Sequence, residues 1–135
     1  MNRPTRILIA EDDALVRDMV RARLNGAGYD TYTGRTGSEA IERVIQLRPH
    51  ALLLDINLPD LDGFGVLEVL QTDLSDVSLP TIMLTARRSS EDVRRAIALG
   101  AADYLTKDVI AQQLLARLAR SLRMVSRQVQ DRAAA

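Results

Sequence analysis

The chain has 135 residues, of which 47% are apolar and 27% charged. This length and composition are typical of one globular domain and argue against a disordered chain. Lys and Arg together number 18, as do Asp and Glu, so no overall charge draws the protein to nucleic acid or to a membrane. Cysteine is absent, which excludes disulfides, thiolate catalysis and cysteine-type zinc sites.

Short apolar strands alternate with segments of helical period in the first half of the chain. Residues 6–10 are the first predicted strand, and Asp13 can cap the helix that follows and that ends at Gly26 and Gly28. The apolar residues of this helix recur at helical spacing: Leu15, Val16, Met19, Val20 and Leu24. Residues 29–33 form a weaker strand, and residues 38–47 a second helix stopped by Pro49. Residues 51–54 are apolar at every position, which indicates a central strand buried on both faces.

The second half repeats this alternation. Gly63 opens a third helix, a polar loop near 73–79 leads to a strand over 81–84, and a fourth helix runs from Ser90 to Gly100. Residues 102–105 are the fifth strand, and the last helix begins near Ile110. Five strand–helix repeats predict an α/β fold with a doubly wound, five-stranded parallel sheet in a single domain, 1–135. Its core is expected over about 6–122, with 123–135 as a helical C-terminal extension or tail.

Polar side chains follow the apolar strands where each strand ends. Glu11 and Asp12 follow the first strand, Asp55 the third, Thr85 the fourth, and Lys107 the fifth. Ligands of open α/β sheets bind beyond the carboxyl ends of the strands. Right-handed crossovers with strand order 2-1-3-4-5 place the first and third strands side by side, so we expect the carboxylates to converge.

Carboxylates that converge repel one another and favour a bound cation. Oxygen ligands without His or Cys indicate Mg²⁺, which keeps positions open for waters or phosphate oxygens. Lys107 and Thr85 offer a positive charge and a hydroxyl donor to phosphoryl oxygens. Phosphoryl transfer needs mainly positioning and charge stabilisation, and a carboxylate can be its nucleophile. Asp55 is the candidate nucleophile because it alone follows the fully buried strand.

At this point the chain resembles the receiver domain of two-component response regulators, a chemotaxis-type, flavodoxin-like (βα)5 domain. The resemblance covers about residues 6–122, and its motifs agree in order and spacing. The matching segments are residues 7–13 (ILIAEDD), 55–63 (DINLPDLDG), 84–86 (LTA), 100–105 (GAADYL) and Lys107.

The resemblance implies a role for each matching position. Asp55 would accept phosphate from a histidine kinase, a phosphotransfer protein or a small phosphodonor. Glu11, Asp12 and Asp55 would bind Mg²⁺, together with the backbone carbonyl of Asn57. Thr85, Lys107 and the backbone N–H of Ala86 would contact the phosphoryl group. Tyr104 would be an aromatic switch whose ring turns inward when Thr85 is drawn to the phosphate, and Asp13 is kept as a helix cap.

Two positions depart from the family pattern or vary within it. Asp108 follows Lys107, where the family usually has proline, often with a cis peptide. Without proline a cis bond costs ~3 kcal/mol, so we expect a trans peptide there. Arg87 lies two places after Thr85, where the family varies. A cation at this position could shield the phosphoryl group from water, and our hypothesis is a longer-lived phosphoryl state than alanine would give.

The last helix carries a heptad pattern of apolar residues at 4-3-4-3-4 spacing: Ala111, Leu115, Leu118, Leu122, Val125 and Val129. Its first half is expected to pack on the sheet, so that a core role explains 111–122. Beyond that, two readings stay open. The extension is either a solvated tail or a helix leading to a second protomer or to an output domain.

The function implied is a phosphorylation-driven switch that acts on a partner or output domain through the face of the fourth helix, fifth strand and fifth helix. We expect no substrate turnover, no direct nucleic-acid or membrane binding, a cytoplasmic location, and a homodimer as one form of partner. A pseudo-receiver that never carries phosphate is one alternative. A dehalogenase-type phosphatase with an aspartyl nucleophile is another, but that class needs an acid two places after the nucleophile, where Asn57 stands.

Overall fold

The computed structural model describes residues 3–75 and 78–134, and the side chains of the last helix as far as Val125. Strands and helices alternate along the chain as predicted. The strands are β1 (Arg6–Ala10), β2 (Asp30–Gly34), β3 (Ala51–Leu54), β4 (Thr81–Thr85) and β5 (Asp103–Thr106). The helices are α1 (Ala14–Gly26), α2 (Gly37–Leu47), α3 (Gly63–Thr72), α4 (Ser90–Ala98), the short 3₁₀ helix η1 (Lys107–Val109) and α5 (Ile110–Ala134).

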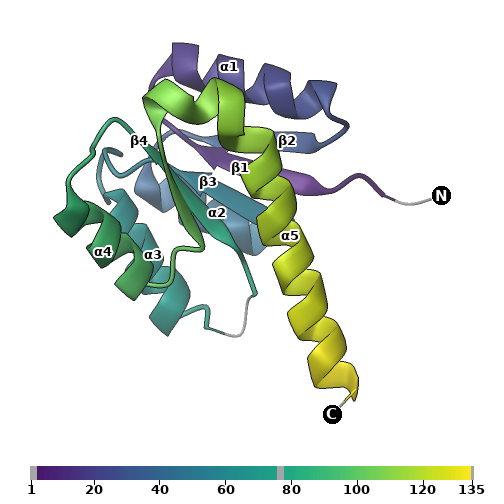
Figure 1. Cartoon of the computed structure of the whole chain (residues 1–135). Helices are drawn as coiled ribbons and strands as arrows, with labels where there is room; N and C mark the ends of the chain where they lie inside the picture. Colours follow the sequence, from purple (N-terminus) through teal and green to yellow (C-terminus); the bar gives the residue numbers. More distant parts are fainter. Residues whose placement is uncertain (1–2, 76–77, 135) are drawn as a thin grey trace.

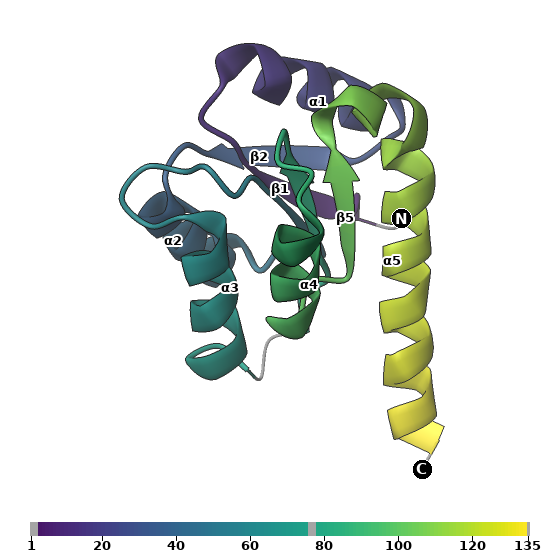
Figure 2. The same cartoon turned by 60° about the vertical axis from the view of Figure 1, so that its left-hand side comes forward.

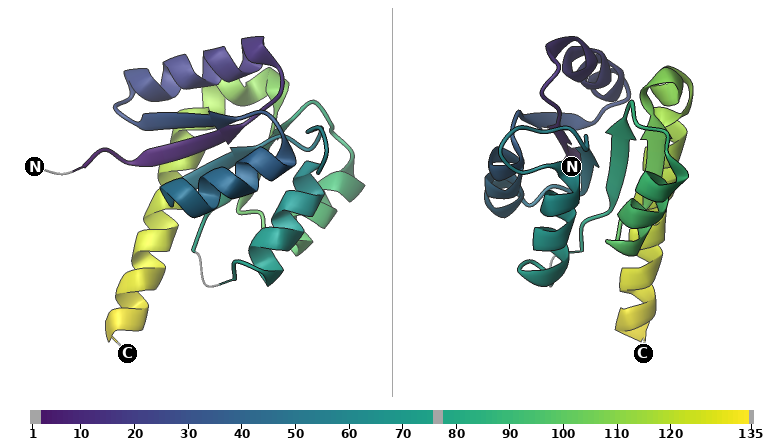
Figure 3. Two further views of the ribbon diagram at one scale, coloured as in Figure 1. Left: turned by 180° about the vertical axis from the view of Figure 1, so that it is seen from behind. Right: turned by 90° about the vertical axis from the view of Figure 1, so that its left-hand side faces the viewer.

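The five strands form one parallel sheet in the order β2-β1-β3-β4-β5, which confirms the predicted doubly wound topology (Figure 1). Helices α1 and α5 cover one face of this sheet, and α2, α3 and α4 cover the other (Figures 1 and 3). Strand β3 lies in the middle, with β1 on one side and β4 on the other.

Both faces of the central strand are buried, as its unbroken apolar sequence predicts. Ala51 and Leu53 belong to the core beneath α1 and α5, whereas Leu52 and Leu54 belong to the core beneath α2, α3 and α4. All four are 0% exposed. Because successive side chains of a strand point to opposite faces, one four-residue segment joins both cores. Each fully buried leucine contributes roughly 2 kcal/mol of hydrophobic stabilisation.

The heptad pattern predicts the wrong buried face for the start of α5. The buried residues of this helix are Ile110, Leu114, Leu118 and Ser121, whereas Ala111 is exposed and Leu115 is 37% exposed. Leucine occurs on both faces of α5, so spacing alone favoured the heptad series, while the sheet selects the i, i+4, i+8 stripe. Val129 lies outside the residues whose side chains are described. The same ambiguity affects α1, where Leu15 is 82% exposed.

Helix α5 continues past the end of the sheet, and its C-terminal part extends away from the other elements (Figure 2). Whether this extension is a tail or a connection to another domain stays a prediction. Among the residues that the structure describes, no helix has the length and apolar content to cross a membrane.

Candidate functional site

The register of the sheet places the first two site residues side by side. Ala10 of β1 is paired with Leu54 of β3, and the backbone N–H of Asp55 donates to the carbonyl of Ala10 over 3.0 Å. Glu11 and Asp55 therefore follow neighbouring strands at the same level. Both are buried, with Glu11 3% and Asp55 5% exposed.

Lys107 joins these two acids. Its Nζ lies 2.8 Å from Glu11 Oε1 and 3.2 Å from Asp55 Oδ2, and it reaches them from the end of β5. Lys107 is the only lysine in a chain that otherwise uses arginine for positive charge. Lysine carries a compact, mobile charge on a flexible stem, whereas the guanidinium of arginine is a rigid planar fork. The site thus combines two buried carboxylates with one cation that is able to move.

The protonation of this cluster reflects its burial. Burial raises the pKa of Glu11 to about 7, the hydrogen bond with Asp55 acts in the same direction, and Lys107 only partly offsets them. Burial lowers the pKa of Lys107, but the hydrogen bond to Glu11 and the charge of Asp55 outweigh it, so the net shift is upward. Lys107 is therefore a cation at neutral pH, and the two acids compete for it.

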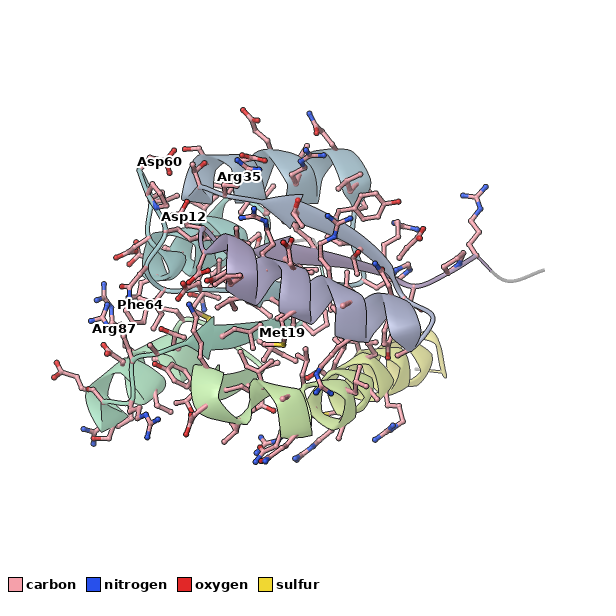
Figure 4. The ribbon with its side chains drawn as sticks, turned by 90° about the horizontal axis from the view of Figure 1, so that it is seen from above. Asp12, Met19, Arg35, Asp60, Phe64 and Arg87 are labelled. Atoms are coloured by element: carbon pink, nitrogen blue, oxygen red, sulfur yellow. The ribbon has the colours of Figure 1, made fainter. Side chains whose placement is uncertain are left out.

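Asp12 does not join the two buried acids. Its side chain is exposed, because successive residues after a strand point in opposite directions and Glu11 occupies the inner position. Figure 4 shows Asp12 at the same edge of the molecule as Asp60, Phe64 and Arg87. The expectation that three carboxylates converge is thus wrong: two converge, and Asp12 lies at the rim. Asp13 caps α1 as predicted, since its Oδ1 accepts from the backbone N–H of Leu15 over 2.9 Å.

The loop from Asp55 to Gly63 is fixed by its own hydrogen bonds. Oδ1 of Asp55 accepts from the backbone N–H of Asn57 over 3.3 Å, and Gly63 N–H donates to the carbonyl of Ile56 over 2.8 Å. A Cβ at Gly63 would lie 2.6 Å from the carbonyl oxygen of Asp55, so only glycine allows this close approach. Asp62 caps α3 through the N–H of Gly65. The loop therefore holds the Asp55 carboxylate at a defined position.

Thr85 and Tyr104 both form a hydrogen bond with the backbone of Arg87. Thr85 is fully buried at the end of β4, and its Oγ1 accepts from the N–H of Arg87 over 3.2 Å. The hydroxyl of Tyr104 donates to the carbonyl of Arg87 over 2.8 Å. Burial, followed by the charge of Asp92, raises the pKa of Tyr104, so its hydroxyl stays protonated at neutral pH. In the described residues no hydrogen bond joins Thr85 to Asp55, and Ala86 is exposed directly after Thr85.

The Arg87 side chain lies across the rim of the site. Its Nε is 3.0 Å from Asp92 Oδ2, and Nη1 makes a long contact of 3.5 Å with Asn57 Oδ1. Its guanidinium carbon is 5.9 Å from the ring centre of Phe64, and Figure 4 shows the two residues next to each other. The sequence indicated a cation near the acceptor, but not that α4 holds it through Asp92.

The segment after Lys107 departs from the family pattern in the expected way. Among the described residues there is no cis peptide bond, which agrees with Asp108 in place of proline. Asp108 pairs with Arg88 over 3.0 Å, and both side chains are about half exposed or more. A hydrogen bond from Thr106 and the charge of Arg88 hold the pKa of Asp108 below its usual range.

One carboxylate oxygen of Glu11 lacks a partner that a cation could supply. Glu11 Oε2 is buried and has no hydrogen-bond partner, and an unpaired buried carboxylate oxygen is costly. In the described parts of the chain, no three acidic, His or Cys side chains lie close enough to form a metal-binding group. Mg²⁺ nevertheless commonly binds through one or two carboxylates with waters and carbonyls. Glu11 and Asp55 fit that requirement, and a closed site of many protein ligands is excluded for these residues.

Arg17 is the site residue that sequence reasoning missed. It is only 8% exposed, and its Nη1 donates to the carbonyls of Glu11 over 3.1 Å and of Asp12 over 3.3 Å. The signal was present in its spacing, because Arg17 stands three and seven residues before the buried Val20 and Leu24. A charge on the inner stripe of an amphipathic helix needs buried partners, and here the partners are carbonyls beside the acids.

The opposite edge of the sheet has a hollow whose lining carries no charged residue. A cavity of about 350 Å³ lies among α3, α4 and the start of β4. Half of the residues that line it are leucines, and the others are neutral: Leu67, Leu70, Gln71, Ser75, Leu79, Thr81, Leu99 and Gly100.

Comparison with known proteins agrees with this geometry. The chain is 38% identical over 122 residues to the DNA-binding dual master transcriptional regulator RpaA of Synechocystis, which covers 90% of the chain and 51% of that protein. It is 38% identical over 123 residues to the transcriptional regulatory protein TrcR of Mycobacterium tuberculosis, which covers 91% of the chain and 47% of that protein. The chain thus spans about half the length of the curated relatives it matches.

Solved structures give the same result. A CheY-like receiver domain from Methanospirillum hungatei matches with a TM-score of 0.85 at 27% identity, over 93% of this chain and 99% of that one. A putative response regulator from Chloroflexus aurantiacus matches with a TM-score of 0.82 at 34% identity, over 90% of this chain and 99% of that one. Residues 7–119 match the family described as the response regulator receiver domain. The chain belongs to the response regulator receiver domain family of two-component signalling.

Proposed function

We propose that Asp55 accepts a phosphoryl group, in a Mg²⁺-dependent reaction, from the phosphohistidine of a histidine kinase or of a phosphotransfer protein. The observation that supports this most strongly is the pair of buried carboxylates bridged by Lys107, with Glu11 Oε2 left without a partner. A resting cation and an unsatisfied carboxylate oxygen at the end of a central strand suit a site that receives both a metal and an anionic group.

Four groups are proposed to hold the metal: Glu11, Asp12, Asp55 and the backbone carbonyl of Asn57. When bound, Mg²⁺ would neutralise charge on the acids and on the incoming phosphoryl oxygens. Glu11 is already turned into the site, whereas Asp12 at the rim is suited to contact through water. The N–H of Asn57 donates to Oδ1 of Asp55 over 3.3 Å, which holds the backbone of Asn57 next to the acceptor.

In the transfer step, a carboxylate oxygen of Asp55 forms a bond to phosphorus while the N–P bond of the donor breaks. The electron pair of that bond returns to the imidazole nitrogen. Lys107 moves its ammonium from the carboxylates toward the phosphoryl oxygens, and the Thr85 hydroxyl and the Ala86 N–H donate to the same oxygens. Because Lys107 already contacts Asp55, this movement is short.

We propose that the conformational change that follows phosphorylation starts at Thr85. If its hydroxyl turns toward the phosphoryl group, it gives up the bond from Arg87 N–H, and the bond from Tyr104 to the Arg87 carbonyl must adjust. This would change the surface formed by α4, β5 and α5, where a downstream partner, an output domain or a second copy of the chain would bind. The phosphoryl group shifts this equilibrium only through its different contacts in the two states.

The comparison proteins suggest one class of output. RpaA is named a DNA-binding regulator, and about half of its length lies outside the match. We therefore propose that the receiver controls another domain or protein instead of contacting nucleic acid itself. Substrate turnover is not part of the proposal, because Asn57 stands where an aspartyl phosphatase needs its acid. A cytoplasmic location, where kinase domains act, belongs to the same proposal.

Intact mass after incubation with acetyl phosphate and Mg²⁺ tests this function. The expected result is one added phosphate in the wild type, no addition in Asp55→Asn, and little without Mg²⁺. Absence of a labile adduct with acetyl phosphate and with a phosphorylated phosphotransfer protein would contradict the proposal and favour a pseudo-receiver. Continuous hydrolysis of an added phosphomonoester, dependent on Asp55, would favour the phosphatase alternative.

A further inference from the structure

The loop that carries Glu11 and Asp12 has few connections to the rest of the molecule. The N–H of Glu11 donates to the carbonyl of Gly34 over 3.0 Å, and the side chain of Asp13 is used by the first turn of α1. The carbonyls of Glu11 and Asp12 are bound by one nitrogen, Nη1 of Arg17. Arg17 thus connects the backbone of Glu11 and of Asp12 to the buried side of α1.

The burial of Arg17 makes this connection specific. Arg17 is 8% exposed as a residue, so its side chain has exchanged most of its water for protein contacts and its hydrogen bonds define its position. A carbonyl that is held in place fixes the peptide plane that follows it, and with it the direction of the next side chain. For the peptide after Glu11, that next side chain is Asp12. Glu11 itself lies between two bonded peptides, because its N–H donates to Gly34 and its carbonyl accepts from Arg17.

We propose that Arg17 is a positioning residue for metal binding: it aims the Glu11 and Asp12 carboxylates by holding their carbonyls. This inference rests on the proposed function, because it assumes that Glu11 and Asp12 help to bind Mg²⁺. Arg17 does not contact the metal or the phosphoryl group in this scheme. It acts in the same way as the outer hydrogen-bond partners that orient the ligands of other metal sites, whose loss typically lowers affinity 10- to 100-fold.

Two explanations of the role of Arg17, its charge and its hydrogen bonds, predict opposite changes in Mg²⁺ affinity when it is replaced by a neutral residue. If only its charge mattered, removal of a buried cation close to the acids would make the site more negative and Mg²⁺ would bind more tightly. If its hydrogen bonds matter, the carbonyls are released, the carboxylates lose their aim and Mg²⁺ binds more weakly. The direction of the change therefore separates the two explanations.

The test is a Mg²⁺ titration followed by backbone amide NMR, without any phosphodonor, for the wild type, Arg17→Met, Arg17→Lys and Arg21→Met. Arg21 is exposed one turn later on α1 and is the control for the loss of one positive charge from that helix. We expect Arg17→Met to raise the Kd for Mg²⁺ about tenfold or more. Arg17→Lys keeps the charge on a shorter side chain, so its Kd should lie between those of the wild type and Arg17→Met. The Kd of Arg21→Met should equal that of the wild type.

The spectra without metal give a second readout. Arg17→Met should shift the amides of residues 11–13 while those of residues 55–57 change little. Unchanged or tighter Mg²⁺ binding in Arg17→Met, with or without a lower melting temperature, would overturn the inference. If Arg17→Met does not fold, Arg17→Lys decides by the same criterion, and a Kd equal to that of the wild type overturns it.

Failure of the proposed function looks different. In that case the wild type itself shows no Mg²⁺-dependent shifts at residues 11–13 and 55–57, and it gains no phosphate from acetyl phosphate. When the wild type binds Mg²⁺ and takes up phosphate but Arg17→Met binds the metal equally well, only the positioning role is overturned.

Discussion

The two sides of the site differ in the solvent exposure of their charged groups. The acid side consists of two buried carboxylates, Glu11 and Asp55, and the partly buried Lys107, at the ends of β1, β3 and β5. The switch side consists of hydroxyls and one ion pair on β4, α4 and β5: Thr85, Arg87, Asp92 and Tyr104. The carboxylates of the acid side are 4% and 6% exposed, whereas the side chain of Arg87 is 42% exposed.

This difference assigns separate tasks to the two sides. Buried like charges are costly, so the acid side stores unfavourable free energy that a cation or a proton relieves. Exposed ion pairs and single hydrogen bonds contribute about 1 kcal/mol or less, so the switch side rearranges at small cost. We therefore expect the acid side to bind the cation and the switch side to change conformation. Substitutions on the two sides should differ in the size of their effect.

The largest effect is expected for Lys107→Met, which removes the cation between two buried carboxylates. In metal-free protein at pH 8, we expect a loss of roughly 3 kcal/mol in the free energy of unfolding. At pH 5.5 the loss should shrink, because Glu11, with a pKa of about 7, then carries a proton. Urea denaturation in EDTA at both pH values measures this, with Lys107→Arg as the charge-retaining control. Equal losses at both pH values would speak against the charge explanation.

Glu11→Gln should act in the opposite direction. The pKa of Glu11 is about 7 when folded and 4.5 in its ordinary setting, so between these values the folded state keeps a proton that the unfolded state has lost. The stability of the wild type should therefore fall as pH rises from about 4.5 to 7, and the penalty remains above that. We expect Glu11→Gln to stabilise metal-free protein at pH 8 by about 2 kcal/mol.

Melting temperatures from pH 5 to 8 check this prediction. The variant should show a flatter pH dependence than the wild type and no stabilisation by Mg²⁺. A variant that is less stable than the wild type at pH 8 would mean that the Glu11–Lys107 pair outweighs the burial cost.

Tyr104→Phe tests the switch side. The substitution removes only the hydroxyl that donates to the Arg87 carbonyl, and the bond lies in a partly exposed position. A loss of about 1 kcal/mol or less is expected, with phosphate uptake by Asp55 unchanged. Chemical denaturation and acetyl phosphate labelling measure the two quantities. A large fall in labelling would show that the two sides are not separable.

The smallest effect on stability is expected for Arg87→Ala. Its ion pair with Asp92 is solvent-exposed on the arginine side, so its removal should change stability by less than about 1 kcal/mol. Our hypothesis is that the arginine shields the phosphoryl group, so the variant should lose phosphate several-fold faster. Intact mass over time after removal of the donor follows this. Asp92→Asn is the matched variant that releases Arg87 without deleting it, and unchanged decay in Arg87→Ala would contradict the shielding role.

The fold was predictable because the apolar content of a strand indicates how deeply it is buried. Residues 51–54 are apolar throughout, and the structure buries them on both faces. The strand ends were accurate to about one residue, as β5 begins at Asp103 instead of Ala102. Asp55 and Lys107 could be brought together from sequence alone, since parallel strands end at a common edge. Asp12 could not be placed in that way, because its direction depends on alternation after the strand.

Other features required three-dimensional context. Arg17 looks like a surface residue until the partners of its guanidinium are known, although its spacing with Val20 was a signal. Leu114 and Leu115 are both leucines on α5, and only the position of the sheet decides that Leu114 is buried. The salt bridge between Arg87 and Asp92 joins a loop to the first turn of α4, a contact that no periodicity predicts.

The central claim is that the acid side receives the phosphate on Asp55, and chemical trapping measures this most directly. The protein is treated with acetyl phosphate with and without Mg²⁺ and then reduced with borohydride, which converts an acyl phosphate to an alcohol. Peptide mass spectrometry locates the reduced residue. We predict reduction at Asp55 alone and only with Mg²⁺; reduction at Glu11, Asp12 or another acid, or equal labelling in EDTA, would contradict the account.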